Sequence, residues 1–152
     1  MRSKIVALIC FLTFLSGCGA DREVAIEYQQ FATTAYSVDG VRLVLNTNYL
    51  FESDRTTLKQ EAVQILRSLH RQIEAEYFTR VEVAAHCDDT ITEKSASDIT
   101  YYQAQVVAGY LWFRGIPASE LTIEGKGFSE PVSSMETPQG VFLNQRIEVL
   151  LT

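Results

Sequence analysis

Four consecutive residues near the middle of the chain have side chains that can bind metals or move protons: His86, Cys87, Asp88 and Asp89. They lie at the end of a β-rich segment that starts at residue 81 and predicts a strand. Neighbouring strand residues point to opposite faces, so His86 and Asp88 can share a site only without Cys87. For the same reason His86 cannot activate the Cys87 thiol. We predict no metal, no cofactor and no enzyme activity, and two roles stay open for Asp88: ligand binding or capping of its own loop.

A helix that follows this strand brings a second polar group toward Asp88. Apolar residues recur at helical spacing from Ile99 to Leu111, after a polar run that ends at Asp98. The stripe predicted to face inward consists of Ile99, Gln103, Val106, Val107, Tyr110 and Leu111. Gln103 is its polar member, and it either contacts a ligand or hydrogen-bonds to the loop after the strand. The strand, loop and helix therefore predict a pocket with Asp88 at the end of the strand.

The other elements follow from the same patterns. Residues 41–45, 121–124 and 147–151 predict strands, and an apolar stripe from Leu58 to Ile73 predicts the first helix, which Ser53 or Asp54 can cap. We therefore predict an α/β (α+β) domain over residues 40–152 with the order β-α-β-α-β-β. Residues 18–39 show no clear period and predict a tether, in which a short helix or strand stays open.

The first residues have the composition of a lipoprotein signal peptide. A basic start is followed by an apolar run, residues 5–15, which is too short to span a bilayer. The sequence Leu15-Ser16-Gly17-Cys18 resembles the lipobox of bacterial lipoproteins, which implies cleavage after residue 17, acylation of Cys18 and, because Gly19 follows, sorting to the outer membrane. Loss of Arg2 and Lys4 lowers the formal charge from −6 to −8. An acidic domain of this kind is a poor nucleic-acid binder.

The central segment resembles the OmpA C-terminal-like domain, by which envelope proteins of diderm bacteria bind peptidoglycan. The frame Ala85-His86-Cys87-Asp88 keeps the spacing of the family's Gly-His-Thr-Asp, and Gly125-Lys126-Gly127 resembles a later Gly-x-Gly. Asn144 and Arg146 match the family's closing Asn-Arg-Arg, in which Gln145 replaces the first arginine. The resemblance implies a mixed sheet with helices packed on one face. Within the central segment, the chain departs from the family at three positions. Ile91, Ala96 and Gln103 stand where the family has glycine, asparagine and arginine.

These replacements change the predicted ligand site. In the family an aspartate binds the ammonium of diaminopimelate and an arginine binds its carboxylate with two parallel hydrogen bonds. The degenerate peptidoglycan site predicted here consists of Asp88, Gln103, Asn144 and Arg146, with Arg146 a candidate cation to pair with Asp88 or with a ligand. Gln103 offers only a neutral amide, which predicts binding that is roughly ten- to a hundredfold weaker, or absent.

The second helix has no charged residue between Asp98 and Arg114. Its outward face is predicted to carry Tyr101, Gln105, Ala108 and Trp112, and a solvated helix would normally carry lysine or glutamate there. Aromatic residues are frequent interface anchors. The face is therefore predicted to dock on another envelope protein, unless the tether or the C-terminal segment covers it.

Two functions of different class follow from these observations. In the first, the chain is a structural subunit of an envelope assembly, anchored to the outer membrane through Cys18 and facing the periplasm. This reading resembles small OmpA-like lipoproteins of secretion systems such as type IVB. In the alternative, the domain binds peptidoglycan and tethers the outer membrane to the cell wall.

Overall fold

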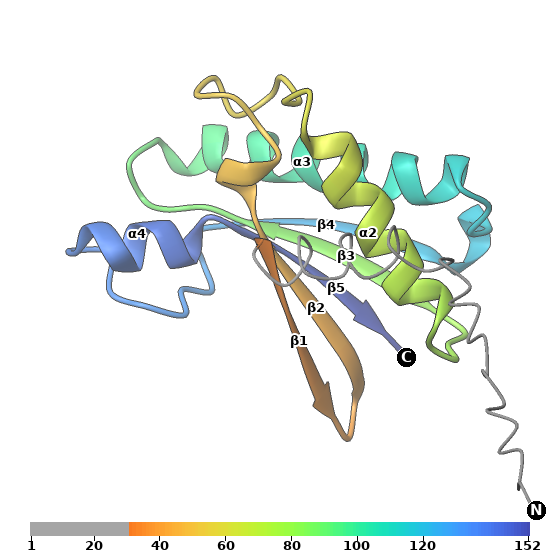
Figure 1. The fold of residues 1–152 in the computed structure, drawn as a ribbon. Helices are drawn as coiled ribbons and strands as arrows, with labels where there is room; N and C mark the ends of the chain where they lie inside the picture. Colours follow the sequence, from red (N-terminus) through yellow and green to blue (C-terminus); the bar gives the residue numbers. More distant parts are fainter. Residues whose placement is uncertain (1–30) are drawn as a thin grey trace, which may run out of the picture.

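The computed structural model describes residues 31–152, which form a five-stranded mixed sheet with the strand order β1-β2-β5-β3-β4 (Figure 1). The strands are β1 (Ala32–Ser37), β2 (Gly40–Asn46), β3 (Val81–His86), β4 (Leu121–Gly127) and β5 (Arg146–Leu151). All neighbouring pairs are antiparallel except β3 and β4, which are parallel and joined through a helix. The predicted mixed α+β fold is confirmed.

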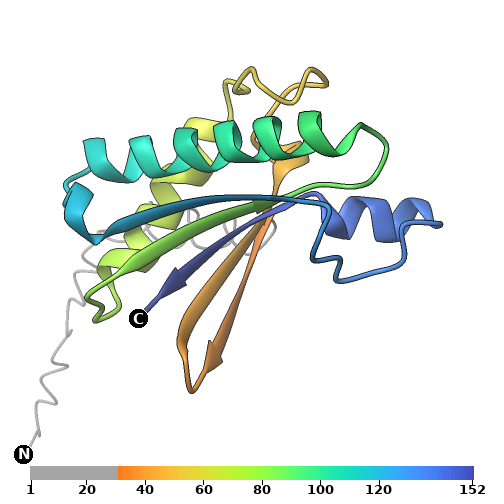
Figure 2. The same ribbon diagram turned by 180° about the vertical axis from the view of Figure 1, so that it is seen from behind.

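Two helices, α2 (Ala62–Glu74) and α3 (Glu93–Phe113), cover one face of the sheet, as Figures 1 and 2 show from opposite sides. Between them and the sheet lies the core, to which alternate residues of β3 and β5 contribute. These residues are Val81, Val83, Ala85, Ile147, Val149 and Leu151. Within residues 31–152, no helix has both the length and the apolar character needed to cross a membrane.

Strand β1 lies inside the stretch 18–39 that the sequence assigned to a tether. It pairs with β2 from Ala32↔Leu45 to Ser37↔Gly40, so the sheet begins before the predicted domain start at Gly40. The two strands form a hairpin that projects beyond the rest of the sheet (Figures 1 and 2). The predicted signal peptide and Cys18 lie outside the described residues.

The first helix starts later than the sequence predicted. Asp54 accepts hydrogen bonds from the backbone N–H groups of Thr56 and Thr57, and thereby caps a turn and not a helix. Leu58 pairs with Phe51 in an isolated bridge, and α2 begins at Ala62 without a side-chain cap. The segment between β2 and α2 is therefore a loop with its own turn and bridge, and not the first turns of α2. It lies close to Asp88.

Helix α3 buries three members of the predicted stripe, Gln103, Val107 and Leu111, together with small residues that the stripe did not include. Ala96, Thr100, Ala104 and Ala108 are buried, whereas Ile99, Val106 and Tyr110 are only partly buried. The helix lies so close to β4 that a Cβ placed on Gly125 would be 2.5 Å from the backbone nitrogen of Tyr101. Small side chains on α3 allow this close approach. Ile99, Val106 and Tyr110 lie toward the edges of the contact and are therefore only partly buried.

A third, short helix, α4 (Pro138–Asn144), was not predicted from the sequence. It stands beyond the end of the sheet and leads directly into β5 (Figure 1). The start of α4 has the residues typical of a helix N-terminus. Thr137 is the N-cap, whose side-chain oxygen accepts a hydrogen bond from the N–H of Gly140, and Pro138 is the first helical residue.

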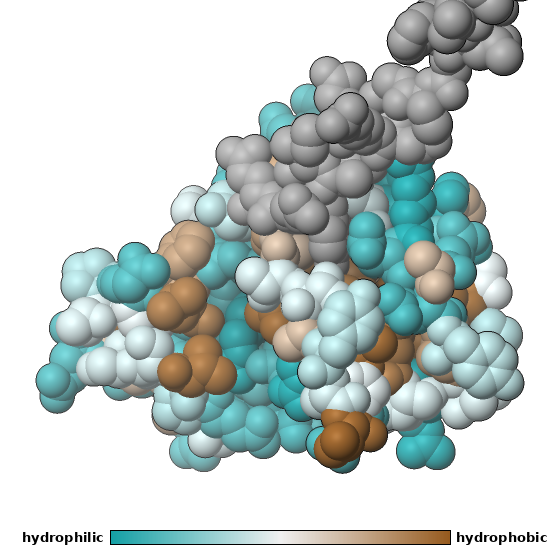
Figure 3. Space-filling model, turned by 60° about the horizontal axis from the view of Figure 1, so that its bottom comes forward, coloured by the Kyte–Doolittle hydropathy of each residue, from teal (hydrophilic) through white to brown (hydrophobic). Residues whose placement is uncertain are grey.

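The face of the sheet opposite α2 and α3 carries several charged residues. Glu82, His86, Arg42 and Glu148 line one hollow on it, and in Figure 3, which brings the underside forward, hydrophilic residues occupy much of the visible surface between smaller hydrophobic groups. The sheet therefore separates an apolar layer under the helices from a face that no described helix covers, which we call the open face. Its polar residues include His86 and Arg146, whose side chains are nonetheless buried.

We predict that Gly125→Ala lowers the free energy of unfolding by about 1–3 kcal/mol, because the added methyl group meets the backbone of α3. Gly109 in the same helix has open space around it, so Gly109→Ala is the matched control and should raise stability by about 0.5–1 kcal/mol. Urea denaturation measures both. Equal effects of the two substitutions would contradict the close approach.

Candidate functional site

Asp88 lies just beyond the end of β3 and has no exposed side-chain surface. Its Oδ1 accepts hydrogen bonds from the backbone N–H of Thr90, at 2.9 Å, and from the Thr90 hydroxyl. Its Oδ2 accepts from Nε2 of Gln145 and lies 3.3 Å from Nη2 of Arg55. A buried carboxylate needs such partners, and Asp88 obtains them from three different loops.

The Arg55 guanidinium is the cation that pairs with this carboxylate. Nη2 of Arg55 also donates to the Thr90 hydroxyl at 3.0 Å, and the side chain is 27% exposed. The backbone of Arg55 has φ +63°, a conformation that residues other than glycine rarely adopt. Nε2 of Gln103 donates to the Arg55 carbonyl oxygen at 2.9 Å and so holds the loop in place.

A small hollow of about 20 Å³ adjoins this pair. It is lined by Thr47, Asn48, Phe51, Glu52, Arg55, Cys87, Gln103 and Gln145. Asn48 and Glu52 are exposed at its rim, whereas Cys87 and Gln103 are buried. Nη1 of Arg55 and Oε1 of Gln103 are both buried without a hydrogen-bond partner among the described residues. Both atoms belong to residues that line the hollow, but the atoms themselves are closed to solvent.

The surroundings shift the pKa of both buried acids of this region. Burial alone would raise the pKa of Asp88, but the hydrogen bonds from Gln145 and Thr90 and the charge of Arg55 outweigh it and hold that pKa below its usual value. Burial raises the pKa of the Cys87 thiol to about 11, and the neighbouring Asp88 charge adds to the effect. Asp88 is therefore charged at neutral pH and Cys87 is a neutral thiol.

Of the four residues of the predicted peptidoglycan site, the structure brings Asp88 and Gln103 to one region, joined through Arg55. Gln103 is hydrogen-bonded to a loop, as one prediction had it, but to the loop before α2 and not to the one after β3. Asp88 also caps its own loop through Thr90.

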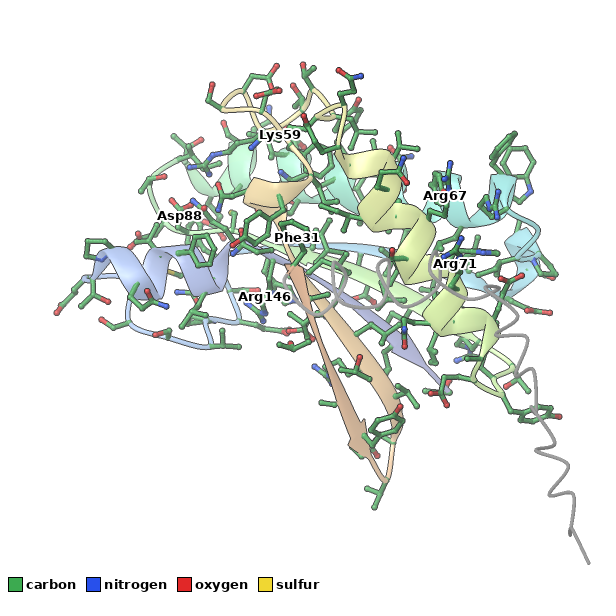
Figure 4. All side chains as sticks on the ribbon, in the orientation of Figure 1. Phe31, Lys59, Arg67, Arg71, Asp88 and Arg146 are labelled. Carbon is green, nitrogen blue, oxygen red and sulfur yellow. The ribbon has the colours of Figure 1, made fainter. Side chains whose placement is uncertain are left out.

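Arg146 and Asn144 lie elsewhere, and the prediction that Arg146 pairs with Asp88 is wrong. Nε of Arg146 is 2.6 Å from Oε1 of Glu148, and Nη2 donates to the Glu130 carbonyl oxygen. Residues alternate between faces, so Gln145 lines the hollow while Arg146 points to the open face. Figure 4 labels Asp88 and Arg146 at separate places.

Asn144 has a structural position at the end of α4. Its Oδ1 accepts from the backbone N–H groups of Val132 and Ser133, and its Nδ2 donates to the Ser133 carbonyl oxygen. The side chain is fully buried. It holds the loop after β4 against α4 and does not line the hollow.

His86 does not share a site with Asp88, which the alternation of strand residues had allowed. It lies on the open face with Nε2 3.9 Å from Oε1 of Glu148, because β3 ends at His86 and the loop turns Asp88 toward Arg55. Burial lowers the pKa of His86 to about 4, and the charge of Arg146 adds to the shift.

The predicted partner face of α3 is exposed, with one exception. Tyr101 is 45% and Trp112 is 61% exposed, and Gln105 is exposed between them. Ala108 is only 1% exposed, so its assignment to this face is wrong, for it packs on the core where the helix approaches the sheet. Tyr102 at 43% and Phe113 at 79% exposed belong to the face instead. We call Tyr101, Tyr102, Gln105, Trp112 and Phe113 the aromatic face.

Sequence reasoning missed Arg55, which is 33 positions before Asp88. The signal it offers is modest: it is the one basic residue between Arg42 and Lys59, in a loop that contains Asp54. No spacing rule connects that loop to the end of β3, and only the packing of α2 and α3 on the same face brings the two together.

A mixed sheet with two helices on one face and a buried aspartate just beyond the end of β3 is the arrangement expected of an OmpA C-terminal-like domain. The profile described as "OmpA family" matches residues 50–145. The chain therefore belongs to the OmpA family, and the predicted membership is confirmed.

Known proteins agree with this assignment. The chain is 30% identical over 108 residues to Outer membrane protein A of Bordetella avium, an alignment that covers 71% of this chain and 56% of that protein. It is 27% identical to Putative lipoprotein YfiB of Escherichia coli over 100% of this chain and 99% of that protein. In fold it resembles the cell wall anchor of the T6SS from Pseudomonas aeruginosa, with a TM-score of 0.75 at 23% identity, covering 86% of this chain and 94% of that one.

We predict that Asp88→Asn lowers the free energy of unfolding by about 1.5–3 kcal/mol at pH 7, because a charged acceptor of several hydrogen bonds is lost. The folded pKa of Asp88 is depressed, so its contribution is present above the unfolded value of about 3.9 and is lost as the pH falls through the folded value. The difference between wild type and variant, measured by denaturation between pH 7 and pH 2, should therefore shrink below about pH 4. A difference that stays constant would contradict the depressed pKa.

Proposed function

We propose that this protein is an outer-membrane lipoprotein, anchored through Cys18, whose domain faces the periplasm and acts as a structural subunit of an envelope assembly. The lipobox-like sequence Leu15–Cys18 supports the anchor, and relatives described as Probable lipoprotein YiaD and Putative lipoprotein YfiB support the class. A secretion system such as type IVB is one assembly of this kind. The role involves no catalysis.

The aromatic face of α3 carries this proposal. Four large aromatic side chains there are 43–79% exposed, and α3 has no charge from residue 99 to its end at Phe113. Exposed apolar surface of this extent is costly in water and is typical of protein interfaces. A protein partner in the envelope would bury it.

Replacement of Trp112 by glutamate should abolish co-purification with envelope partners and leave the fold intact, because the side chain is 61% exposed. Affinity purification of the lipidated protein from solubilised envelopes, compared by mass spectrometry, measures the loss. Tyr77→Glu is the matched control, since Tyr77 is 96% exposed and lies outside α3. Normal assembly of the Trp112→Glu protein would contradict the proposal.

Contact with peptidoglycan is proposed to be weak at the Asp88 site. The Asp88 carboxylate already accepts from Thr90 and Gln145 and pairs with Arg55, so a ligand ammonium would have to displace one of them. Gln103 stands in place of the family's arginine, so it has no guanidinium that could donate two parallel hydrogen bonds to a ligand carboxylate. Both points favour a smaller binding energy for a stem peptide that ends in free carboxylates.

A second candidate function, tethering of the outer membrane to the wall, is favoured by one observation. Arg55 puts a guanidinium beside Asp88, so the hollow has a cation although the family's arginine is absent. Peptidoglycan-binding protein ArfA of Mycobacterium tuberculosis is 28% identical to this chain over 101 residues, which is 31% of that protein's length.

Co-sedimentation with sacculi whose diaminopimelate carboxylates are free distinguishes the two candidates. We expect retention at physiological salt roughly ten- to a hundredfold weaker than that of a family member with the arginine. Retention as strong as in such a member, and abolished by Asp88→Ala, would instead establish the tether.

A further inference from the structure

We propose that residues 21–30 of the chain form a short helix that docks along α2, in a groove beside the start of β1. The groove is a hollow of about 340 Å³ that we call the N-terminal groove. It is lined by Phe31, Tyr49, Lys59, Glu61, Gln64 and Ile65. The point where the chain enters the groove, the spacing of the apolar residues before that point and the charge of α2 support this occupant.

Phe31, the first described residue, is itself part of the groove lining. It is helical, although β1 begins at the next residue. Its side chain is partly buried against the core, and its ring meets the ring of Tyr49 edge to face with 4.9 Å between the centroids. The residues that precede Phe31 therefore leave the described domain at the groove.

These preceding residues include apolar side chains at helical spacing. Val24, Tyr28 and Phe31 follow each other at intervals of four and three positions, so on a helix they share one face. Ile26 falls on the opposite face of the same helix. The stretch 18–39 shows no single period because it also contains β1. A helix that ends at Phe31 would continue the apolar face of that residue along the groove.

The charge of α2 complements the charge of this segment. Residues 62–73 contain two charged side chains, Arg67 and Arg71, which are exposed and lie one turn apart. Residues 21–30 contain three acidic residues and one arginine, a net charge of −2, and two of the acids are Glu23 and Glu27. These two glutamates are also one turn apart on a helix. The two elements therefore attract each other.

The positions of the charges agree with an antiparallel arrangement of the two helices. A helix rises about 1.5 Å per residue, so the two glutamates would lie about 6 Å and 12 Å from Phe31 along the segment. Arg67 and Arg71 lie about 5 Å and 11 Å from Gln64 along α2, and Gln64 lines the groove. Figure 4 labels Phe31 at the start of β1 and the two arginines further along α2.

A segment of the same chain has an advantage over a separate partner in this groove. It is joined covalently to Phe31, so its effective concentration at the groove is roughly millimolar. Another protein would have to displace it. The groove is thus a different kind of surface from the aromatic face of α3, which no segment of the described residues covers.

Docking shortens the connection to the membrane, a consequence that rests on the proposed anchor at Cys18. Residues 19–30 could span about 40 Å if they were extended. With residues 21–30 docked, residues 19 and 20 remain as the linker and span about 7 Å. This position suits a subunit that assembles at the outer membrane better than a tether that reaches the wall.

Cleavage by a glutamate-specific endoproteinase tests the docking in the full purified chain. Mass spectrometry follows the fragment that begins at Tyr28, and its rate of formation is divided by the rate for a free peptide of residues 19–31. We expect cleavage after Glu27 to be about tenfold slower, or more, in the protein. Cleavage at the rate of the free peptide would overturn the proposal. The readout does not use the lipid, so failure of the proposed anchor would leave this result unaffected.

Tyr28→Ser and Ile26→Ser form a matched pair, because each removes an apolar side chain from the segment. Tyr28→Ser should speed the cleavage about tenfold, since it removes a docked side chain, whereas Ile26→Ser should change it less than about twofold. Each rate is divided by that of a free peptide with the same substitution. Equal effects of the two substitutions would overturn the proposed docked face.

Arg67→Glu should speed the same cleavage about two- to fivefold, because it places a negative charge opposite the acidic segment. Lys94→Glu makes the same change at an exposed position at the start of α3 and should have no effect. Thermal unfolding checks that both variants fold. An unchanged rate in folded Arg67→Glu protein would overturn the docking on α2, and the pair of serine variants decides the question if that protein is unstable.

Discussion

A carboxylate without exposed surface must be compensated, and at Asp88 this requirement joins three loops of the domain. Arg55 comes from the loop before α2, Thr90 from the loop before α3 and Gln145 from the residue before β5. An ionised carboxylate in a buried place costs several kcal/mol unless it is paired and hydrogen-bonded. The position of each loop therefore depends on the same group, and so does the hollow that they surround.

The origin of the cation distinguishes this domain from the pattern it resembles. The family's motif places aspartate and arginine on one strand–loop–helix unit, whereas here the guanidinium comes from a loop outside that unit. Gln103 keeps a related task, because its amide holds the backbone that carries the guanidinium. Residue 103 is thus a neutral amide in this chain, and the cation beside Asp88 belongs to another element.

Strand alternation divides the remaining polar residues into two independent groups. On the open face, Arg146 pairs with Glu148, and His86 lies beside the same carboxylate. On the side of the helices, Gln145 and Cys87 line the hollow. Residues that are adjacent in sequence, such as Gln145 and Arg146, therefore belong to different environments. A site assigned from a sequence motif that spans such a pair will combine residues that do not meet.

The sequence by itself determined the class of the fold, the strands β2, β3, β4 and β5, the inward direction of Gln103 and the position of Asp88 at the end of β3. These features depend on local periodicity and on a motif within one continuous unit. Only the tertiary structure decided that Arg55 pairs with Asp88, that Arg146 does not, and that Ala108 faces the sheet. The pairing depends on how two loops 33 residues apart pack, and the rotation of α3 depends on the missing side chain of Gly125 on a different strand. Such contacts between distant segments leave no period in the chain, because the free energy that selects them arises only when the layers come together.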